Sequence, residues 1–348
     1  MGVYMKKNKW KNYFKIGIEK AIPFLINIIF VMGFGFFFGN ENILLSVSIG
    51  VGLTMFPLCP LQWKPSTLFL IVLFLYGVGA LMGETYLLSP FLAFLLNFIF
   101  VILIVLLSSE PSSMKPSISF LLCFVFAEST SVPIEMLPKR LLCAITGSII
   151  VTIVTLLFWK KKGYNRNGRT LIEQIELGNK NHHYMFRMAF GIALAIFIGM
   201  VFHLKKPLWI SIVVMSLTQL DFEETIDRIK NRFIGNLLGM LLFFIFFQFI
   251  IPKEYALYVI LLLGYMGSFF SEYKYKQTIN AISALNASLV LLDTSEALLD
   301  RLLFLGIGIC IVLSIYYLAT FLKKMYYTYL YDKIASHFPF HQRKEIEL

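Results

Sequence analysis

The chain has 348 residues, of which 58% are hydrophobic and only 15% are charged, whereas soluble domains carry about 25% charged residues. Its formal net charge of +11 does not indicate nucleic acid, because a nucleic-acid partner requires a basic face on a soluble element and the basic residues here lie between apolar runs. The composition therefore excludes a water-soluble protein and predicts an all-α, polytopic membrane protein whose helices contact the lipid bilayer.

Twelve apolar segments follow one another along the chain in two sets of six. They lie at 21–38, 42–58, 66–83, 88–108, 117–127 and 141–159, and then at 188–204, 207–220, 233–251, 255–270, 277–292 and 302–322. An ordinary span needs about 20 residues, so the segments at 117–127, 207–220 and 277–292 either begin within their charged flanks or form broken or re-entrant helices. The pattern predicts about 12 transmembrane helices.

Lysine and arginine residues concentrate in alternate loops. When both termini are placed in the cytoplasm, 25 of the 31 basic residues lie on the cytoplasmic side, and cytoplasmic loops are known to carry such an excess. The distribution predicts an even number of spans and two cytoplasmic termini. We also expect a multi-pass location in the plasma (inner) membrane.

Two stretches at corresponding places in the two sets resemble each other. Arg140 begins RLLCAITG and Arg301 begins RLLFLGIG, so each opens the last span of its set and has a glycine seven residues later. Six spans is an even number, so the halves would share one orientation, as in transporters built from parallel repeats. We therefore predict a first six-helix half at 1–162, a cytoplasmic joint at 163–186 and a second six-helix half at 187–348.

The most highly charged interruption of the apolar pattern is DFEETIDRIKNRFIGNLLGM at 221–240, interpreted as a cytoplasmic loop that runs into a helix. Arg228, Arg232, Gly235 and Gly239 are spaced at i, i+4, i+7 and i+11, which puts them on one helical face. One interpretation is a set of basic anchors followed by a glycine face for close helix packing. In the other, the arginines guard the cytoplasmic mouth of a path for anions, and the two are compatible.

Four stretches carry a resemblance to a known family. They are Arg187-Met-Ala-Phe-Gly, Pro207-Leu-Trp209, Thr218-Gln219 and Arg228-Ile-Lys-Asn-Arg232-Phe-Ile-Gly235-Asn-Leu-Leu-Gly239. This pattern resembles the fusaric acid resistance and aromatic acid exporter family of integral membrane transporters. Asn236 stands where that family usually has threonine, and Leu208 replaces the tyrosine before Trp209. The resemblance implies export of aromatic and other organic acids, with Arg187, Trp209, the two arginines and Asn236 on the substrate path.

Polar residues within spans are costly unless they face protein or water. Asn280, Ser283 and Asn286 interrupt the segment at 277–292 and fall near one helical face. They form either a hydrogen-bonded seam between helices or part of the substrate path.

The end of a short apolar segment carries Gln219 and Asp221. These two residues are likewise either simple helix caps or part of the path.

Acidic residues precede the last span of each half. Glu128 comes before Arg140, and Asp293 comes before Arg301. An acid beside a base at a repeated position either carries protons in an antiporter, since partial burial raises a carboxyl pKa toward the working range, or belongs to a loop ion pair.

Catalytic and metal-binding patterns are absent from the sequence. The four cysteines lie singly in apolar runs, without paired spacing, and we expect them to be small core residues. His182 and His183 lack further ligands for a metal, and neither a nucleophile elbow nor a glycine-rich phosphate loop is present. The sequence therefore predicts a protein that is not an enzyme and has no cofactor and no metal.

The leading hypothesis is an integral membrane transporter that exports small organic, aromatic-acid-like anions or related toxic compounds along a path between the two halves. The alternative is a non-transporting membrane scaffold or envelope-assembly component. A transporter should direct Asn280, Ser283 and Asn286 at a shared cavity, whereas a scaffold should bury them in helix contacts. The sequence leaves open the substrate, the driving ion and whether the chain forms a homo-oligomer.

Overall fold

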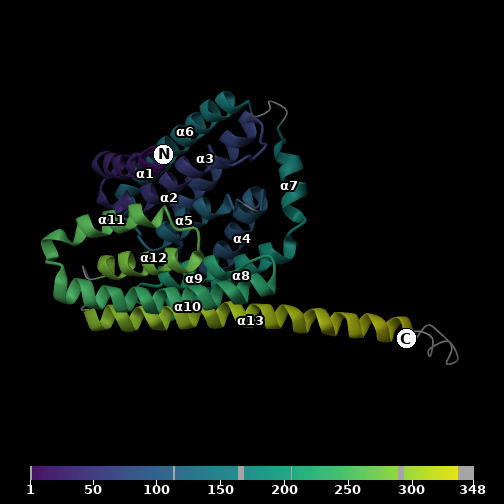
Figure 1. Cartoon of the computed structure of the whole chain (residues 1–348). Helices are drawn as coiled ribbons and strands as arrows, with labels where there is room; N and C mark the ends of the chain where they lie inside the picture. Colours follow the sequence, from purple (N-terminus) through teal and green to yellow (C-terminus); the bar gives the residue numbers. More distant parts are fainter. Residues whose placement is uncertain (1, 113, 164–167, 205, 289–293, 336–348) are drawn as a thin grey trace.

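The computed structural model describes residues 2–112, 114–163, 168–204, 206–288 and 294–335. These residues form α-helices with a few short 3-10 and π segments, and the β-type pairing among them is a single isolated bridge between Trp63 and Arg169. Figure 1 shows helices throughout the described chain, most of them gathered in one packed body. The predicted α-helical class is therefore confirmed for the described part of the chain.

The first six helices lie within residues 1–162. They are α1 (Gly2–Phe38), α2 (Ile43–Met55), α3 (Pro65–Leu81), α4 (Pro90–Ser108), α5 (Ser117–Glu128) and α6 (Leu137–Lys162). Pro65, Pro90 and Pro138 lie in the first turns of α3, α4 and α6, where a missing backbone N–H leaves no intrahelical hydrogen bond unmade. α6 ends at Gly163, whose φ of 71° is the left-handed conformation typical of a helix C-terminus.

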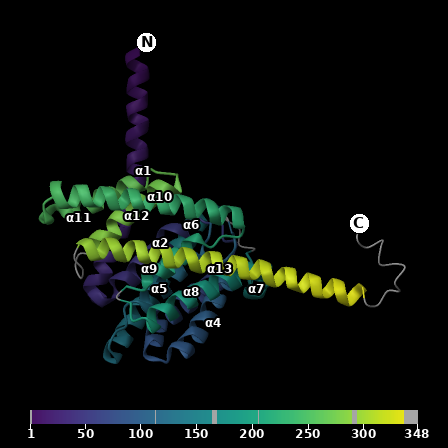
Figure 2. The same cartoon turned by 90° about the horizontal axis from the view of Figure 1, so that it is seen from below.

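Seven helices follow. They are α7 (Leu171–Asn179), α8 (His182–Val201), α9 (Leu208–Leu217), α10 (Phe222–Ile245), α11 (Ala256–Gly267), α12 (Tyr273–Ser288) and α13 (Thr294–Ala335). A π-helical turn at Phe246–Ile250 extends α10. Figure 2 shows that α1 and α13 both project beyond the packed body, in different directions.

The charged stretch after Asp221 is helical from Phe222 onward, so the loop expected there is wrong. Glu223 and Glu224 occupy the first turn of α10, where negative charge is favoured by the helix dipole. Glu224 also pairs with Arg228 one turn later, at 3.1 Å between Oε1 and Nε. These local interactions stabilise the helical conformation of the charged turns that precede the apolar part of α10.

The joint between the halves contains a helix, α7, that the sequence did not predict. Thr170 and Glu173 form a capping box at its start, which satisfies two backbone donors. The buried Gln174 accepts a hydrogen bond from Trp63 Nε1 at 2.9 Å and donates one to the backbone oxygen of Leu107 at 3.1 Å. The joint is thereby fastened to the first half.

Six helical segments of the described chain are long and apolar enough to cross a membrane. They are Lys15–Phe38, Pro65–Leu87, Pro90–Ser108, Ile134–Lys162, His182–Val201 and Glu296–Tyr326. Three shorter apolar helices are Ser117–Glu128, Leu208–Leu217 and Ala256–Gly267. The protein is thus a multi-pass membrane protein, and the count of about 12 spans stays a prediction. Part of the segment at 277–292 lies outside the described residues.

The two predicted halves pack directly on each other. α4 lies along α8, and α5 contacts α9. Phe94 and Phe98 of α4 meet Phe186, Phe190 and Phe197 of α8, with rings set edge to face. Such pairs add about 0.5–1.5 kcal/mol each beyond the free energy gained from the apolar area they bury. They therefore stabilise the contact between α4 and α8.

The halves share part of their internal contact pattern. The first helix packs on the second and the second on the sixth in both sets, through α1, α2 and α6 and through α8, α9 and α13. The third helices differ, because α3 packs chiefly on α6 whereas α10 packs chiefly on α12. The duplication therefore stays a prediction.

Many large apolar side chains are exposed, among them Phe36, Ile153 and Leu241. Such faces suit contact with lipid. Cys59, Cys123 and Cys143 are buried, but Cys310 is exposed on α13. The expectation of a core position is wrong for Cys310, because it shares an exposed stripe of α13 with Leu303 and Tyr317.

The predicted orientation can be tested by cysteine labelling in a variant whose four native cysteines are replaced by serine. Because the basic residues concentrate in alternate loops, cysteines placed beside Arg169 and Lys333 should react with a membrane-impermeant maleimide only in inverted vesicles. Cysteines beside Asn40 and Glu84 should react in whole cells. Labelling near Arg169 and Lys333 from opposite sides would rule out two halves of equal orientation.

Candidate functional site

Two adjoining cavities lie between the halves. The inner cavity has a volume of about 600 Å³ and is lined by α2 and α5 of the first half and by α8, α9, α10, α12 and α13 of the second. The outer cavity has a volume of about 320 Å³ and is lined by the loop after α4, the start of α8, the end of α9 and the first turns of α10. Lys115, Tyr184, Gln219 and Arg228 line both. The inner volume lies in the range that holds a small organic ligand.

Six of the residues predicted from the sequence line the inner cavity. They are Trp209, Gln219, Arg228, Arg232, Asn280 and Ser283. They come from α9 and its C-terminal end, from α10 and from α12. The tertiary fold therefore brings together residues that are more than 70 positions apart in the sequence.

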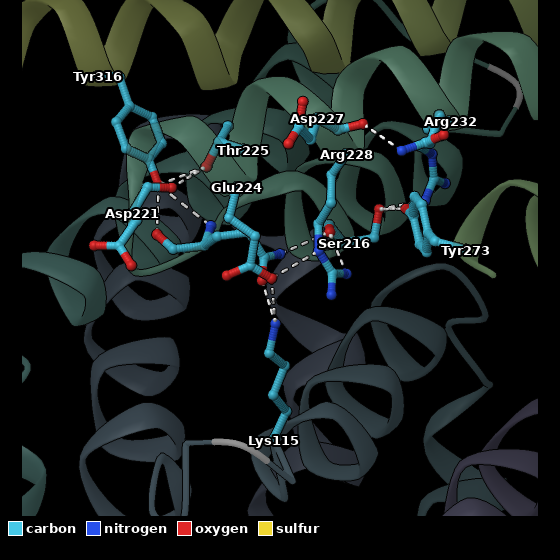
Figure 3. Close-up of polar contacts among 12 residues, drawn as sticks. Lys115, Ser216, Asp221, Glu224, Thr225, Asp227, Arg228, Arg232, Tyr273 and Tyr316 are labelled. Atoms are coloured by element: carbon cyan, nitrogen blue, oxygen red, sulfur yellow. Dashed lines mark hydrogen bonds and ion pairs between the residues drawn. The ribbon is translucent and has the colours of Figure 1, made fainter. Parts of the chain in front are cut away.

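Arg232 is 2% exposed and lies deep in α10. Its Nη1 donates hydrogen bonds to Ser216 Oγ and, at 3.2 Å, to the Tyr273 hydroxyl, as Figure 3 shows. Its Nε has no hydrogen-bond partner, and no carboxylate among the described residues forms a salt bridge with it. A buried guanidinium with a spare donor is a position for an anion, because Arg keeps its charge.

Arg301 of α13 is the second buried cation of the inner cavity, at 7% exposed. Its guanidinium lies over the Trp209 ring at 4.7 Å, and its Nε donates to Asn236 Oδ1 at 3.0 Å. Its Nη1 has no partner. From the sequence, Arg301 is only a repeated residue at the start of the last apolar segment; its position at the edge of a span was the signal that could have identified it.

Four cations line the inner cavity, namely Lys115, Arg228, Arg232 and Arg301. Among the described residues that line it there is no aspartate or glutamate. Arg232 and Arg301 are buried, whereas Lys115 and Arg228 are partly exposed and contact Glu224. Two buried charges of the same sign are costly without compensation, so this end of the cavity favours an anionic occupant.

An apolar wall faces these cations. It consists of Ile118, Leu121, Leu122 and Phe126 of α5, with Met188 of α8 beside them. Together the two sides suit a molecule with an anionic end and an apolar body, since each end finds a matching surface.

A group of three charged residues lies between the inner and outer cavities. Lys115 Nζ is 3.4 Å from Glu224 Oε1 and also donates to Gln219 Oε1. The same Glu224 oxygen is 3.1 Å from Arg228 Nε. Burial lowers the pKa of Lys115, the charge of Arg228 lowers it further, and Glu224 opposes this effect. From the sequence alone, Lys115 is only a marker of topology.

The glycines of α10 bring α12 close to the site. A Cβ at Gly235 would lie 2.7 Å from the backbone oxygen of Lys274, and a Cβ at Gly239 would lie 2.6 Å from that of Thr278. Glycine allows this approach of two helices. The approach holds Tyr273 against Arg232 and lets α12 direct its polar residues into the inner cavity.

Arg187 does not line either cavity and instead caps the backbone at the C-terminal end of α9. Its Nη2 donates to the backbone oxygens of Gln219 at 3.2 Å and Leu220 at 2.7 Å, and its guanidinium lies over the Tyr316 ring at 4.2 Å. The Tyr316 hydroxyl also accepts a hydrogen bond from Thr225 Oγ1 at 2.9 Å. Arg187 therefore positions Gln219 at the boundary between the cavities.

Three further predicted path residues lie off the cavities, and a fourth predicted residue cannot be placed. Asp221 is exposed at the start of α10, where its backbone oxygen accepts a hydrogen bond from Thr225 Oγ1. Asn236 is buried and orients Arg301 through its Oδ1. Asn286 is half-buried on α12. Asp293, predicted to couple protons, lies outside the described residues.

Glu128 is buried at the opposite end of α5 from Lys115. Its Oε2 accepts a hydrogen bond from Thr85 Oγ1 at 2.7 Å, and Thr85 also lies 3.2 Å from Asn97 Oδ1. No ion pair joins Glu128 to Arg140, whose Nε donates to Asn42 Oδ1 at 3.2 Å. Each member of this predicted pair thus has its own polar partners.

The fold is that of a multi-pass α-helical membrane protein, and comparison with a known family supports a protein of transporter or resistance type. Residues 194–315 match the family described as fusaric acid resistance protein-like. The resemblance predicted from the sequence is thereby confirmed, and the matched part carries most of the residues lining the inner cavity. No curated protein and no solved structure matches the chain.

Proposed function

We propose that the protein is a plasma-membrane exporter of small organic anions of the aromatic-acid type. The observation that carries the proposal is the inner cavity, in which four cations face an apolar wall and no described acidic residue takes part in the lining. The resemblance of residues 194–315 to the fusaric acid resistance family supports the same function.

Two arginines that line the inner cavity have unpaired N–H donors available to a bound carboxylate. Arg232 Nε and Arg301 Nη1 are both buried and unpartnered, and arginine–carboxylate hydrogen bonds are about twice as strong as neutral ones. An aromatic ring attached to that carboxylate would lie against the apolar wall of α5. The substrate would thus neutralise the cavity while it buries its own apolar surface.

The alternative of a non-transporting scaffold is less well supported. In a scaffold the polar residues of α12 would be buried in helix contacts, but Asn280 is exposed and lines the inner cavity together with Ser283. Only Asn286 lies away from the cavity, and this single position does not make a polar seam.

Within this proposal Glu128 remains the candidate for proton coupling. Thr85 Oγ1 lies 2.8 Å from the backbone oxygen of Met82 and 2.7 Å from Glu128 Oε2. None of the ion pairs found among the described residues involves Glu128, and a buried charge without a partner is costly. A buried carboxyl in this position could take up and release a proton during transport.

The experiment that tests the function uses purified protein in proteoliposomes loaded with benzoate, an aliphatic carboxylate such as hexanoate, or uncharged benzamide. We expect protein-dependent efflux of benzoate, slower efflux of hexanoate and none of benzamide, because the cavity selects negative charge first and apolar shape second. Folded, reconstituted protein that moves neither carboxylate would favour the scaffold.

A further inference from the structure

We propose that the outer cavity is a second carboxylate-binding site, and that the side chain of Glu224 occupies it in this structure. The carboxylate of an incoming substrate would displace Glu224 from Lys115 and Arg228 before it passes into the inner cavity. This inference rests on the proposed export of organic anions and names the entry step of that path.

The two cations of the outer site come from different halves. Lys115 belongs to the loop between α4 and α5, and Arg228 belongs to α10. Both contact the same oxygen, Oε1 of Glu224, at 3.4 Å and 3.1 Å, and Figure 3 shows Lys115 reaching from the first half toward this carboxylate. One carboxylate oxygen thus bridges a residue of the first half and a residue of the second.

The rest of the outer cavity is also suited to a carboxylate. Ser109, Ser112, Ser117 and Asn181 line it with polar groups. Ser109 Oγ is buried and has no hydrogen-bond partner. Asn181 Nδ2 donates to Glu110 Oε1 at 2.7 Å, outside the lining. Glu224 is the one acidic residue that lines the cavity among those described, so its release would leave Lys115 and Arg228 without their carboxylate and Ser109 Oγ as a free donor.

Glu224 is able to leave without disturbing the cations. Its side chain is 46% exposed, whereas those of Lys115 and Arg228 are each 28% exposed, and exposed ion pairs of this kind contribute little to stability. Arg228 would keep its place, because it also lies over the Tyr273 ring at 4.9 Å. A substrate carboxylate could therefore replace that of Glu224 on an unchanged pair of cations.

The test compares benzoate binding to Glu224→Gln, to the wild-type protein and to Glu223→Gln, measured by calorimetry in mild detergent. Glu223 is an exposed neighbour in the same helical turn, so its substitution removes the same charge. We expect Glu224→Gln to bind benzoate about fivefold more tightly, because the internal competitor has lost its charge. Glu223→Gln should bind as the wild type does, and the double variant Glu224→Gln with Lys115→Gln should lose the gain.

The outcomes separate this inference from the proposed function. Equal tightening in Glu223→Gln and Glu224→Gln would reduce the effect to net charge and overturn the inference, as would unchanged or weaker binding in Glu224→Gln. Tighter binding confined to Glu224→Gln would support the site even if the proteoliposomes showed no efflux, in which case only the export function would fail. Normal efflux with unchanged binding in Glu224→Gln would overturn the role of Glu224 as an internal competitor, while the proposed export function would stand.

Discussion

Replacing Arg232 by glutamine should raise the apparent Km for benzoate by at least about tenfold while the protein still folds and reaches the membrane. Arg232 is buried at the inner cavity and has a spare Nε donor. A charge-assisted hydrogen bond in such surroundings contributes about 1.5–3 kcal/mol, and about 1.4 kcal/mol corresponds to a tenfold change in binding. Glutamine keeps a polar side chain without the charge, so we expect little loss of structure. The measurement is the initial rate of benzoate efflux from proteoliposomes at several internal concentrations.

Two other substitutions on α10 serve as controls. Lys230→Gln removes the same charge from a side chain that is 69% exposed, and it should leave the Km unchanged. Arg228→Gln should have an intermediate effect, because Arg228 is half-buried and already paired with Glu224. An unaltered Km in Arg232→Gln at normal expression would mean that this arginine only anchors the helix end on the cytoplasmic side.

The helices and part of the site could be predicted from the sequence because both depend on local patterns. Long apolar runs require helices in a membrane, and the spacing of Arg228, Arg232, Gly235 and Gly239 places them on one helical face. The structure has this face directed at α12 and the inner cavity. Patterns of this kind can be recognised in the sequence without knowing which helices are neighbours.

The remaining site residues depend on contacts between distant segments. Lys115 lies in a short loop, and Ser216 is one hydroxyl in an apolar helix, so neither differs from many similar residues until α10 and α5 are brought together. In the sequence Tyr273 is one of several tyrosines near a helix start. In the structure its hydroxyl accepts a hydrogen bond from Arg232, and its ring lies under the guanidinium of Arg228. The helix α7 was missed for a different reason, since polar segments carry a weaker periodic signal than apolar ones.

Replacing Gly235 by leucine should abolish assembly of the folded protein. At this position a Cβ would already lie 2.7 Å from the backbone oxygen of Lys274 and 2.9 Å from Gln277 Cβ. The oxygen belongs to the α12 backbone and cannot rotate away as a side chain would, so the two helices must separate. Separation would remove Tyr273 from Arg232 and open the small core of Phe243, Ile282 and Leu285. The loss of these contacts adds to the cost of overpacking, which by itself is about 1–3 kcal/mol. We expect loss of the monodisperse peak in size-exclusion chromatography.

A matched control distinguishes this packing effect from a general intolerance of leucine for glycine in the helices. Gly306 lies on α13, is exposed, and has no atom within 4 Å of the place where a Cβ would lie, so Gly306→Leu should assemble normally. Gly235→Ala should give a partial loss, because even one methyl group meets the Lys274 oxygen. The two α10 predictions then separate the roles of its face: Arg232→Gln should lose affinity in a folded protein, and Gly235→Leu should lose the fold. If Gly235→Leu instead eluted and transported as the wild type does, close contact between α10 and α12 would not be needed, and the glycine spacing would have no structural role.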